Sequence, residues 1–204
     1  MATVETRDKI LQAAGPVFAE LGLEKATVRD ICASAEVNLA SVNYHFGSKE
    51  QLYIEVVRYL HRRRIEENPL PDWPPGTPAE SRLRDFIANL MAFMFSDEGT
   101  WEARLMRREM LNPTQACAES VEDFIRPHFG MMQGIIEEIA PGLPLHRRQQ
   151  FGFSVIGQCV FYKFHREVVL LLIPEPERAE HFQPQQLADH ITDVVLTALR
   201  SHQP

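Results

Sequence analysis

The fold is decided by residues 27–46, which read TVRDICASAEVNLASVNYHF. The opening Thr27-Val28-Arg29-Asp30 has the form of a capping box, which predicts a short helix from Thr27 to about Ser34. A turn at 35–37 separates it from a second short helix over 38–46. Helices of this length are not stable alone in water, so neighbouring helices must hold them.

Longer amphipathic helices flank this pair on both sides. Apolar residues at helical spacing predict a first helix, which Gly22 stops. Ser48, with Gln51 three residues later, predicts the start of a further helix that continues to about Glu67. Short helices joined by a three-residue turn and held by longer ones form a helix-turn-helix. In that arrangement the second short helix enters the major groove of DNA.

The same residues resemble a known family. The run from Thr27 to Val37, followed by Ser41 to Leu52, is similar to the signature of the TetR/AcrR regulators. The resemblance covers about residues 6–60 and is most specific at Tyr-His-Phe followed by Ser-Lys-Glu-x-Leu. It implies a DNA-binding transcriptional regulator, and it implies that His45 contacts a phosphate.

Positions for DNA contact follow from the chemistry of each side chain. Lys49, at a helix N-terminus, favours a phosphate, and asparagine can pair with adenine. Tyr44 and His45 have an alternative role in packing onto the next helix. The predicted contacts are Thr27, Arg29, Asn38, Leu39, Ala40, Ser41, Asn43, Tyr44, His45 and Lys49.

Two residues depart from the family pattern. Glu36 stands where relatives often have glycine, so the turn is expected to carry left-handed backbone strain and a negative charge near DNA. Asn43 stands where many relatives have tyrosine. Both departures concern which operator is recognised rather than the mode of binding.

The rest of the chain also reads as helical. Five prolines between Asn68 and Pro78 mark a joint, so the expected domains are a head at 1–67 and a body at 79–204. The expected fold is all-α, with a three-helix helix-turn-helix head, a larger helical domain for ligand binding and dimerisation, and about nine helices. Residues 101–113, 125–127 and 154–162 resemble the CerR/CecR-type C-terminal domain. Members of that subgroup are linked to drugs or other small molecules, so the resemblance implies a small-molecule effector.

Methionine, aromatic and isolated polar residues in the body suggest an effector pocket. For any one of them, ordinary core packing is the alternative, and for Glu109 the alternative is an internal ion pair. The predicted ligand-binding residues are Phe86, Trp101, Arg104, Glu109, Phe124, His128, Gln158 and Tyr162.

Composition excludes several classes of protein. The net charge is −7, but residues 1–64 hold nine Lys/Arg and eight Asp/Glu, so the head carries +1 and the remainder −8. Three distant cysteines fit a reducing cytoplasm, and no signal peptide or membrane span is expected. Eight histidines show no metal-ligand spacing, and nucleotide-binding and hydrolase motifs are missing. We therefore expect neither an enzyme nor a cofactor or metal site.

Assembly and regulation complete the prediction. Apolar faces on helices 145–172 and 187–199 suggest a homodimer through the last two predicted helices, unless these faces fill the core of one chain. A dimer would place two recognition helices one DNA turn apart, on a palindromic operator. We expect a repressor that a small molecule releases. The alternatives are an interaction protein with this fold and no effector, and a small-molecule-binding protein with a vestigial head.

Overall fold

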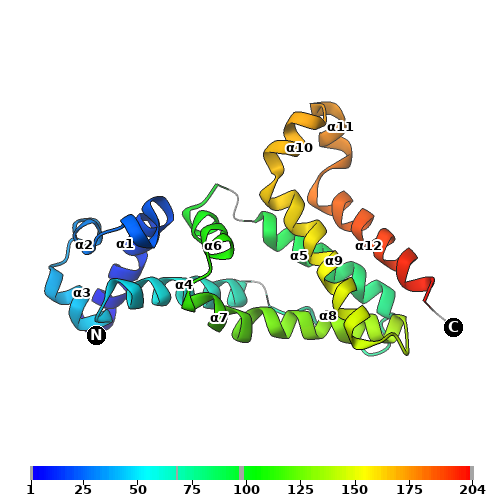
Figure 1. Cartoon of the computed structure of the whole chain (residues 1–204), viewed down its shortest axis with the longest axis horizontal. Helices are drawn as coiled ribbons and strands as arrows, with labels where there is room; N and C mark the ends of the chain where they lie inside the picture. The colour runs from blue at the N-terminus through cyan, green and yellow to red at the C-terminus, as the bar shows by residue number, and fades with distance from the viewer. Residues whose placement is uncertain (1, 68, 97–98, 203–204) are drawn as a thin grey trace. The chain divides into compact units, whose positions relative to one another are not determined.

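The computed structural model describes residues 2–67, 69–96 and 99–202 (Figure 1). Its described residues form twelve α-helices and one π-helical turn, so the prediction of an all-helical chain is confirmed. The elements are α1 (Ala2–Lys25), α2 (Val28–Ala35), α3 (Leu39–Phe46), α4 (Lys49–Glu67), α5 (Ala79–Phe95), α6 (Trp101–Leu111), α7 (Gln115–Ser120), η1 (Val121–Ile125), α8 (Arg126–Ile139), α9 (Leu145–Phe164), α10 (Arg166–Leu172), α11 (Glu175–His181) and α12 (Pro184–Arg200).

The structure has more helices than the nine expected. The π-helical turn η1 separates α7 from α8, and the helix expected over 145–172 is divided at His165. Helix α11 forms although Pro174 and Pro176 lie at its start. These prolines lie at its N-cap and in its first turn, where a missing N–H costs nothing.

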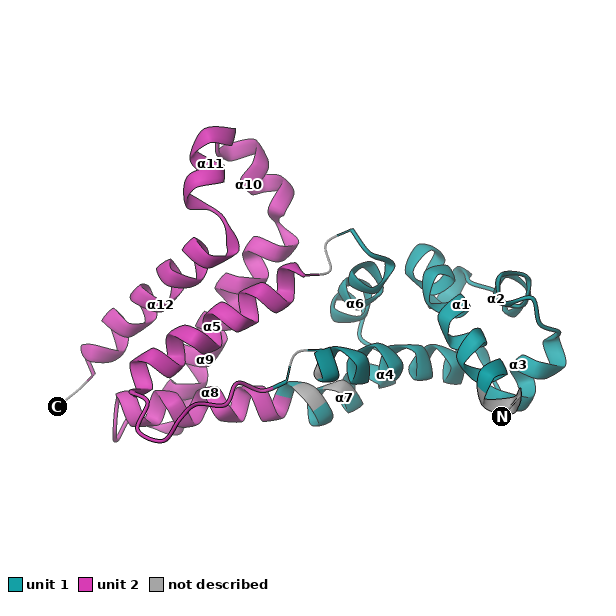
Figure 2. Ribbon diagram, turned by 180° about the vertical axis from the view of Figure 1, so that it is seen from behind, with its two compact units in different colours: residues 1–69, 97–125 teal, residues 70–96, 126–204 magenta. Residues whose placement is uncertain are grey.

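The described residues divide into two compact units (Figure 2). Unit 1 comprises residues 1–69 and 97–125, and unit 2 comprises 70–96 and 126–204. Helices α6 and α7 therefore pack with the N-terminal helices, although the sequence pattern assigned them to the body. The domain boundaries 1–67 for DNA binding and 79–204 for effector binding and dimerisation remain a prediction.

Unit 1 is built around α1 and α4. Phe18 and Tyr53 meet edge to face with ring centroids 5.1 Å apart. The short helices add their apolar sides to the same core, α2 through Ile31 and α3 through Val42 and Phe46. Tertiary packing thus stabilises two helices of eight residues each that would not persist alone.

Unit 2 is a bundle of α5, α8, α9 and α12. Its core includes Val155, Ile191, Val195 and Leu199. These four residues belong to the apolar faces from which the sequence predicted a dimer interface, and they fill the core of unit 2, as the alternative for those faces expected. None of the helices within the described residues is both long and apolar enough to cross a membrane.

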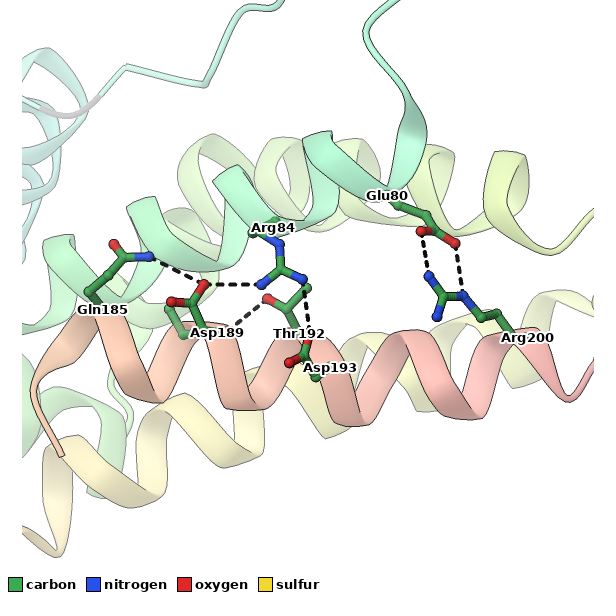
Figure 3. Close-up of polar contacts among 8 residues, drawn as sticks. Glu80, Arg84, Gln185, Asp189, Thr192, Asp193 and Arg200 are labelled. Carbon is green, nitrogen blue, oxygen red and sulfur yellow. Dashed lines mark hydrogen bonds and ion pairs between the residues drawn. The ribbon is translucent and has the colours of Figure 1, made fainter. Parts of the chain in front are cut away.

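Exposed ion pairs run along the rim where α12 lies against α5 (Figure 3). Arg84 of α5 binds Asp189 at 3.0 Å and Asp193 at 2.8 Å. Arg200 of α12 donates two hydrogen bonds, of 3.1 and 2.6 Å, to the carboxylate of Glu80. Because these groups are solvent-exposed, each pair contributes little to stability, and the apolar core carries most of the packing energy.

Candidate nucleic-acid interface

The N-terminus of α2 is closed by a complete capping box. The Thr27 hydroxyl donates to the Asp30 carboxylate at 2.6 Å and accepts from the Asp30 N–H at 3.2 Å. The hydrogen bonds that the hydroxyl and the N–H of Thr27 donate to the carboxylate lower the pKa of Asp30. The predicted capping is confirmed, and it constrains the predicted phosphate contact, because the Thr27 hydroxyl proton must leave Asp30 before it can bind an oxygen of DNA.

The turn between the short helices has the predicted left-handed residue. Glu36 lies at φ 51°, ψ 45°, and is the one residue other than glycine with positive φ in the described part of the chain. The Val37 N–H donates to the carbonyl oxygen of Cys32 and closes α2. The Glu36 carboxylate lies 3.4 Å from the Lys9 amine, in a well-exposed pair.

Substituting Glu36→Gly should stabilise the protein by about 1 kcal/mol, because glycine adopts positive φ without the Cβ clash. Chemical denaturation measures this change. Glu36→Ala is the matched control: it also removes the charge but keeps the Cβ, so it should not stabilise. Equal stabilisation by both substitutions would assign the effect to charge instead of backbone strain.

Asn38 caps the recognition helix. Its side-chain oxygen accepts from the Ser41 N–H at 2.8 Å and from the Ser41 hydroxyl at 3.1 Å. A bidentate contact to adenine needs an acceptor as well as a donor. With its acceptor engaged in the cap, Asn38 is suited to donate from its amide NH₂, and adenine reading fits Asn43 better.

One face of α3 is turned to solvent. Leu39, Ala40, Asn43 and Tyr44 are exposed, Leu39 by 51% and Tyr44 by 79%. Their spacing of one, four and five residues places them on the same side of the helix, opposite the side that enters the core. Four of the predicted contacts thus form a continuous surface that can enter a groove.

His45 lies at the flank of this face. Its ring is 5.1 Å from that of Tyr44 and 6.1 Å from that of Phe46, between centroids. It is half-buried, which suits both the packing role and the phosphate role predicted for it.

The basic residues lie beside the short helices. Lys49 is the first residue of α4, and its amine donates to the carbonyl oxygen of Glu24 at 3.3 Å. This contact brings Lys49 to the junction of α1 and α2, close in sequence to the Thr27 cap. Arg29 is exposed on the first turn of α2.

Sequence reasoning missed Arg7 as a residue that holds the recognition helix. Its guanidinium lies 5.3 Å from the centroid of the Phe46 ring and pairs with Glu55 of α4. A cation stacked on an aromatic face and paired on its other side is well placed to fix α3. No local pattern reveals this role, because both partners are far away in the sequence.

The predicted ligand-binding residues are distributed over both units. Trp101, Arg104 and Glu109 belong to unit 1, and the side chain of Phe124 lies outside what the structure describes. Glu109 is 1% exposed and accepts hydrogen bonds from Tyr53 and Thr114, so its internal partners are neutral donors and not the ion-pair partner considered as the alternative. The remaining four, in unit 2, are Phe86, His128, Gln158 and Tyr162.

Two of these residues share a surface hollow of about 390 Å³ on the outer side of α9. Gln158 and Tyr162 line it together with Ser154, Gly157 and Phe161. Phe86 lies instead in the core of unit 2. Within the described residues, no group of three or more His, Cys, Asp or Glu side chains is arranged to hold a metal ion.

Two family models match the chain. Residues 79–199 match the C-terminal domain of the HTH-type transcriptional dual regulator CecR. Residues 10–56 match the bacterial regulatory proteins of the tetR family.

Individual relatives agree with these models. The HTH-type transcriptional dual regulator CecR of Shigella flexneri is 25% identical over 185 residues, covering 82% of this chain and 79% of the relative. The repressor KstR2 of Mycolicibacterium smegmatis is 50% identical over 52 residues, 26% of this chain and 25% of the repressor. Among solved structures, AibR in complex with isovaleryl coenzyme A and operator DNA has a TM-score of 0.65 at 16% identity, covering 93% of this chain and 97% of AibR.

Proposed function

Because this chain belongs to the TetR family of bacterial transcriptional regulators and carries the CecR-type C-terminal domain, it is a DNA-binding regulator and not an enzyme, and we propose that it binds a palindromic operator as a homodimer. The observation that carries the proposal is the exposed face of α3, with Leu39, Ala40, Asn43 and Tyr44 on one side of a capped helix. On this proposal Asn43 reads a base edge and Leu39 contacts a thymine methyl. Arg29 and Lys49 bind phosphates and set the register.

Exposed apolar residues support dimerisation through α9 and α12. Phe153 and Phe161 on α9 are 65% and 46% exposed, and Val194 on α12 is 46% exposed. On α9 the exposed Gly157 lies between the two phenylalanines, with nothing within 4 Å of a Cβ built on it. An apolar surface with a small residue at its centre suits close packing against a second copy. Phe161 and Val194 belong to the faces first predicted, whereas Val155, Ile191, Val195 and Leu199 of the same faces lie in the core.

We further propose that a small molecule bound by the body releases the regulator from DNA and that the protein acts as a repressor in the cytoplasm. AibR was solved with isovaleryl coenzyme A and operator DNA together, which supports an effector for this chain. The hollow at Gln158 and Tyr162 shares Gly157 and Phe161 with the proposed dimer surface, so we do not assign the effector to it. Release requires that the effector bind more tightly to the state that is poor at binding DNA.

The test of the function is selection of duplexes from a random pool, followed by titration of the selected duplex with the purified protein. The proposal expects a palindrome bound by two chains. Failure to enrich any sequence would contradict it. Release of that duplex by isovaleryl coenzyme A, or by another small molecule in a screen, tests the effector, and retention of DNA with every compound would count against relief by a ligand.

Substituting Arg29→Ala or Lys49→Ala should weaken binding several-fold on all sequences alike, because phosphate contacts carry no base information. Because the homodimer carries each residue twice, each substitution should also reduce the slope of log affinity against log salt by about 1.8. Fluorescence anisotropy over a range of salt concentrations measures both effects. Arg147→Ala, an exposed residue on α9 of unit 2, removes the same charge and should change neither. An unchanged slope in Arg29→Ala and Lys49→Ala would remove these residues from the phosphate contacts.

A further inference from the structure

Helices α1 and α6 meet in unit 1 through two glycines. The ring of Trp101 fills the space that a Cβ on Gly15 would occupy. A Cβ on Gly22 would lie 2.5 Å from Nη1 of Arg108. Gly22 follows Gly15 by seven residues, and Arg108 follows Trp101 by seven residues. Seven residues are about two turns of a helix. The helices therefore run in the same direction, with their register fixed at two points.

The second of these points lies at an interruption of α1. Gly22 has φ 76° and ψ 169°, a backbone conformation that is essentially limited to glycine. Just before it, the carbonyl oxygen of Glu20 accepts a hydrogen bond of 3.2 Å from Nη2 of Arg108. Just after it, the carbonyl oxygen of Glu24 accepts one of 3.3 Å from Lys49. A cation from α6 and a cation from α4 thus hold the carbonyls on either side of the bend.

The bend leads directly into the DNA-binding elements. Helix α1 ends at Lys25, and the Thr27 cap of α2 follows after a single residue. Thr27 and Lys49 are both expected at phosphates, so the direction of the chain after Gly22 decides where these groups lie. Phosphate contacts fix the register of a protein on DNA, which makes their placement important for affinity.

We propose that Arg108 is a positioning residue for DNA binding, which rests on the proposed function of the α2–α3 surface. By binding the Glu20 carbonyl beside Gly22, it fixes the bend from which α2 begins. Arg108 is itself exposed, so its substitution should change the unfolding transition little. The substitution should instead make the backbone at the α1–α2 junction more mobile and lower the affinity for DNA.

The test combines two measurements on Arg108→Gln. The variant should bind the duplex selected by the wild type at least fivefold more weakly. In the absence of DNA, amide hydrogen exchange in residues 20–28 should be faster than in the wild type. The second measurement separates positioning from direct contact, because a side chain that only touches DNA leaves the free protein unchanged. Arg108→Lys, which can also donate to the Glu20 carbonyl, should retain affinity within about twofold.

Trp101→Leu is the matched control, since it weakens the other α1–α6 contact, two turns away from the bend. It should lower thermal stability while leaving affinity and exchange in residues 20–28 unchanged. Wild-type affinity or unchanged exchange in folded Arg108→Gln overturns the proposal, and so does an equal loss of affinity in folded Trp101→Leu. If the wild type selects no duplex, the proposed function fails, and exchange in the free protein still decides whether Arg108 holds the bend.

Discussion

Replacing Glu109 by alanine should lower the free energy of unfolding by about 4 kcal/mol, as expected when one partner is removed from a buried polar network. The carboxylate is 1% exposed. It accepts hydrogen bonds from the Tyr53 hydroxyl at 2.7 Å and from the N–H and hydroxyl of Thr114, both at 2.8 Å. These bonds join α4, α6 and the start of α7, so alanine would leave three donors facing a cavity. Urea denaturation followed by circular dichroism measures the loss.

Two milder variants show which part of the network carries this energy. Burial raises the pKa of Tyr53, and the hydrogen bond to Glu109 raises it further, so the phenol remains protonated and donates. Tyr53→Phe removes one donor and should cost about 1 kcal/mol, whereas Glu109→Gln retains an acceptor and should cost less than alanine. A Glu109→Ala protein within 1 kcal/mol of the wild type, with a lost effector response, would instead favour the ligand role first predicted for this residue.

Glu109 illustrates why sequence patterns identified a polar residue without identifying its role. A glutamate among apolar neighbours indicates burial, and burial requires a partner. Tyr53 lies 56 positions away, so its hydrogen bond is invisible to spacing within a helix. The sequence showed no partner for Glu109, and for that reason the residue is predicted to bind a ligand. The structure shows hydrogen-bond partners for it within unit 1.

Local chemistry was the most predictable part of the chain. The Thr27–Asp30 capping box and the left-handed Glu36 depend on residues within one or two turns, and both are present as expected. Close packing at Gly15 and Gly22 was not predicted, because each glycine is matched to a side chain of α6 more than eighty residues later. For the same reason the sequence could not show that α6 belongs with the head.

Lowering the pH from 6.5 to 4 should destabilise the protein through His61 by about 3 kcal/mol. Burial lowers the pKa of His61 to about 4, with a further lowering by Arg64 and an opposing effect of Glu109. Well above pH 6.5 the imidazole is neutral in both states, so this contribution is constant there. Between pH 6.5 and 4 the unfolded chain binds a proton that the folded chain does not, and each pH unit costs about 1.4 kcal/mol.

The control for this prediction is His61→Gln, which is neutral throughout the range. The carboxylates are the same in both proteins. Subtracting the unfolding free energy of the variant from that of the wild type therefore leaves the contribution of His61. The difference in unfolding free energy should be flat well above pH 6.5 and should change steadily in favour of the variant as the pH falls to 4. Parallel curves over this range would mean that the folded protein admits a proton at His61 as readily as the unfolded chain does. In that case the side chain would have to be hydrated in the native state, and burial would not set its charge.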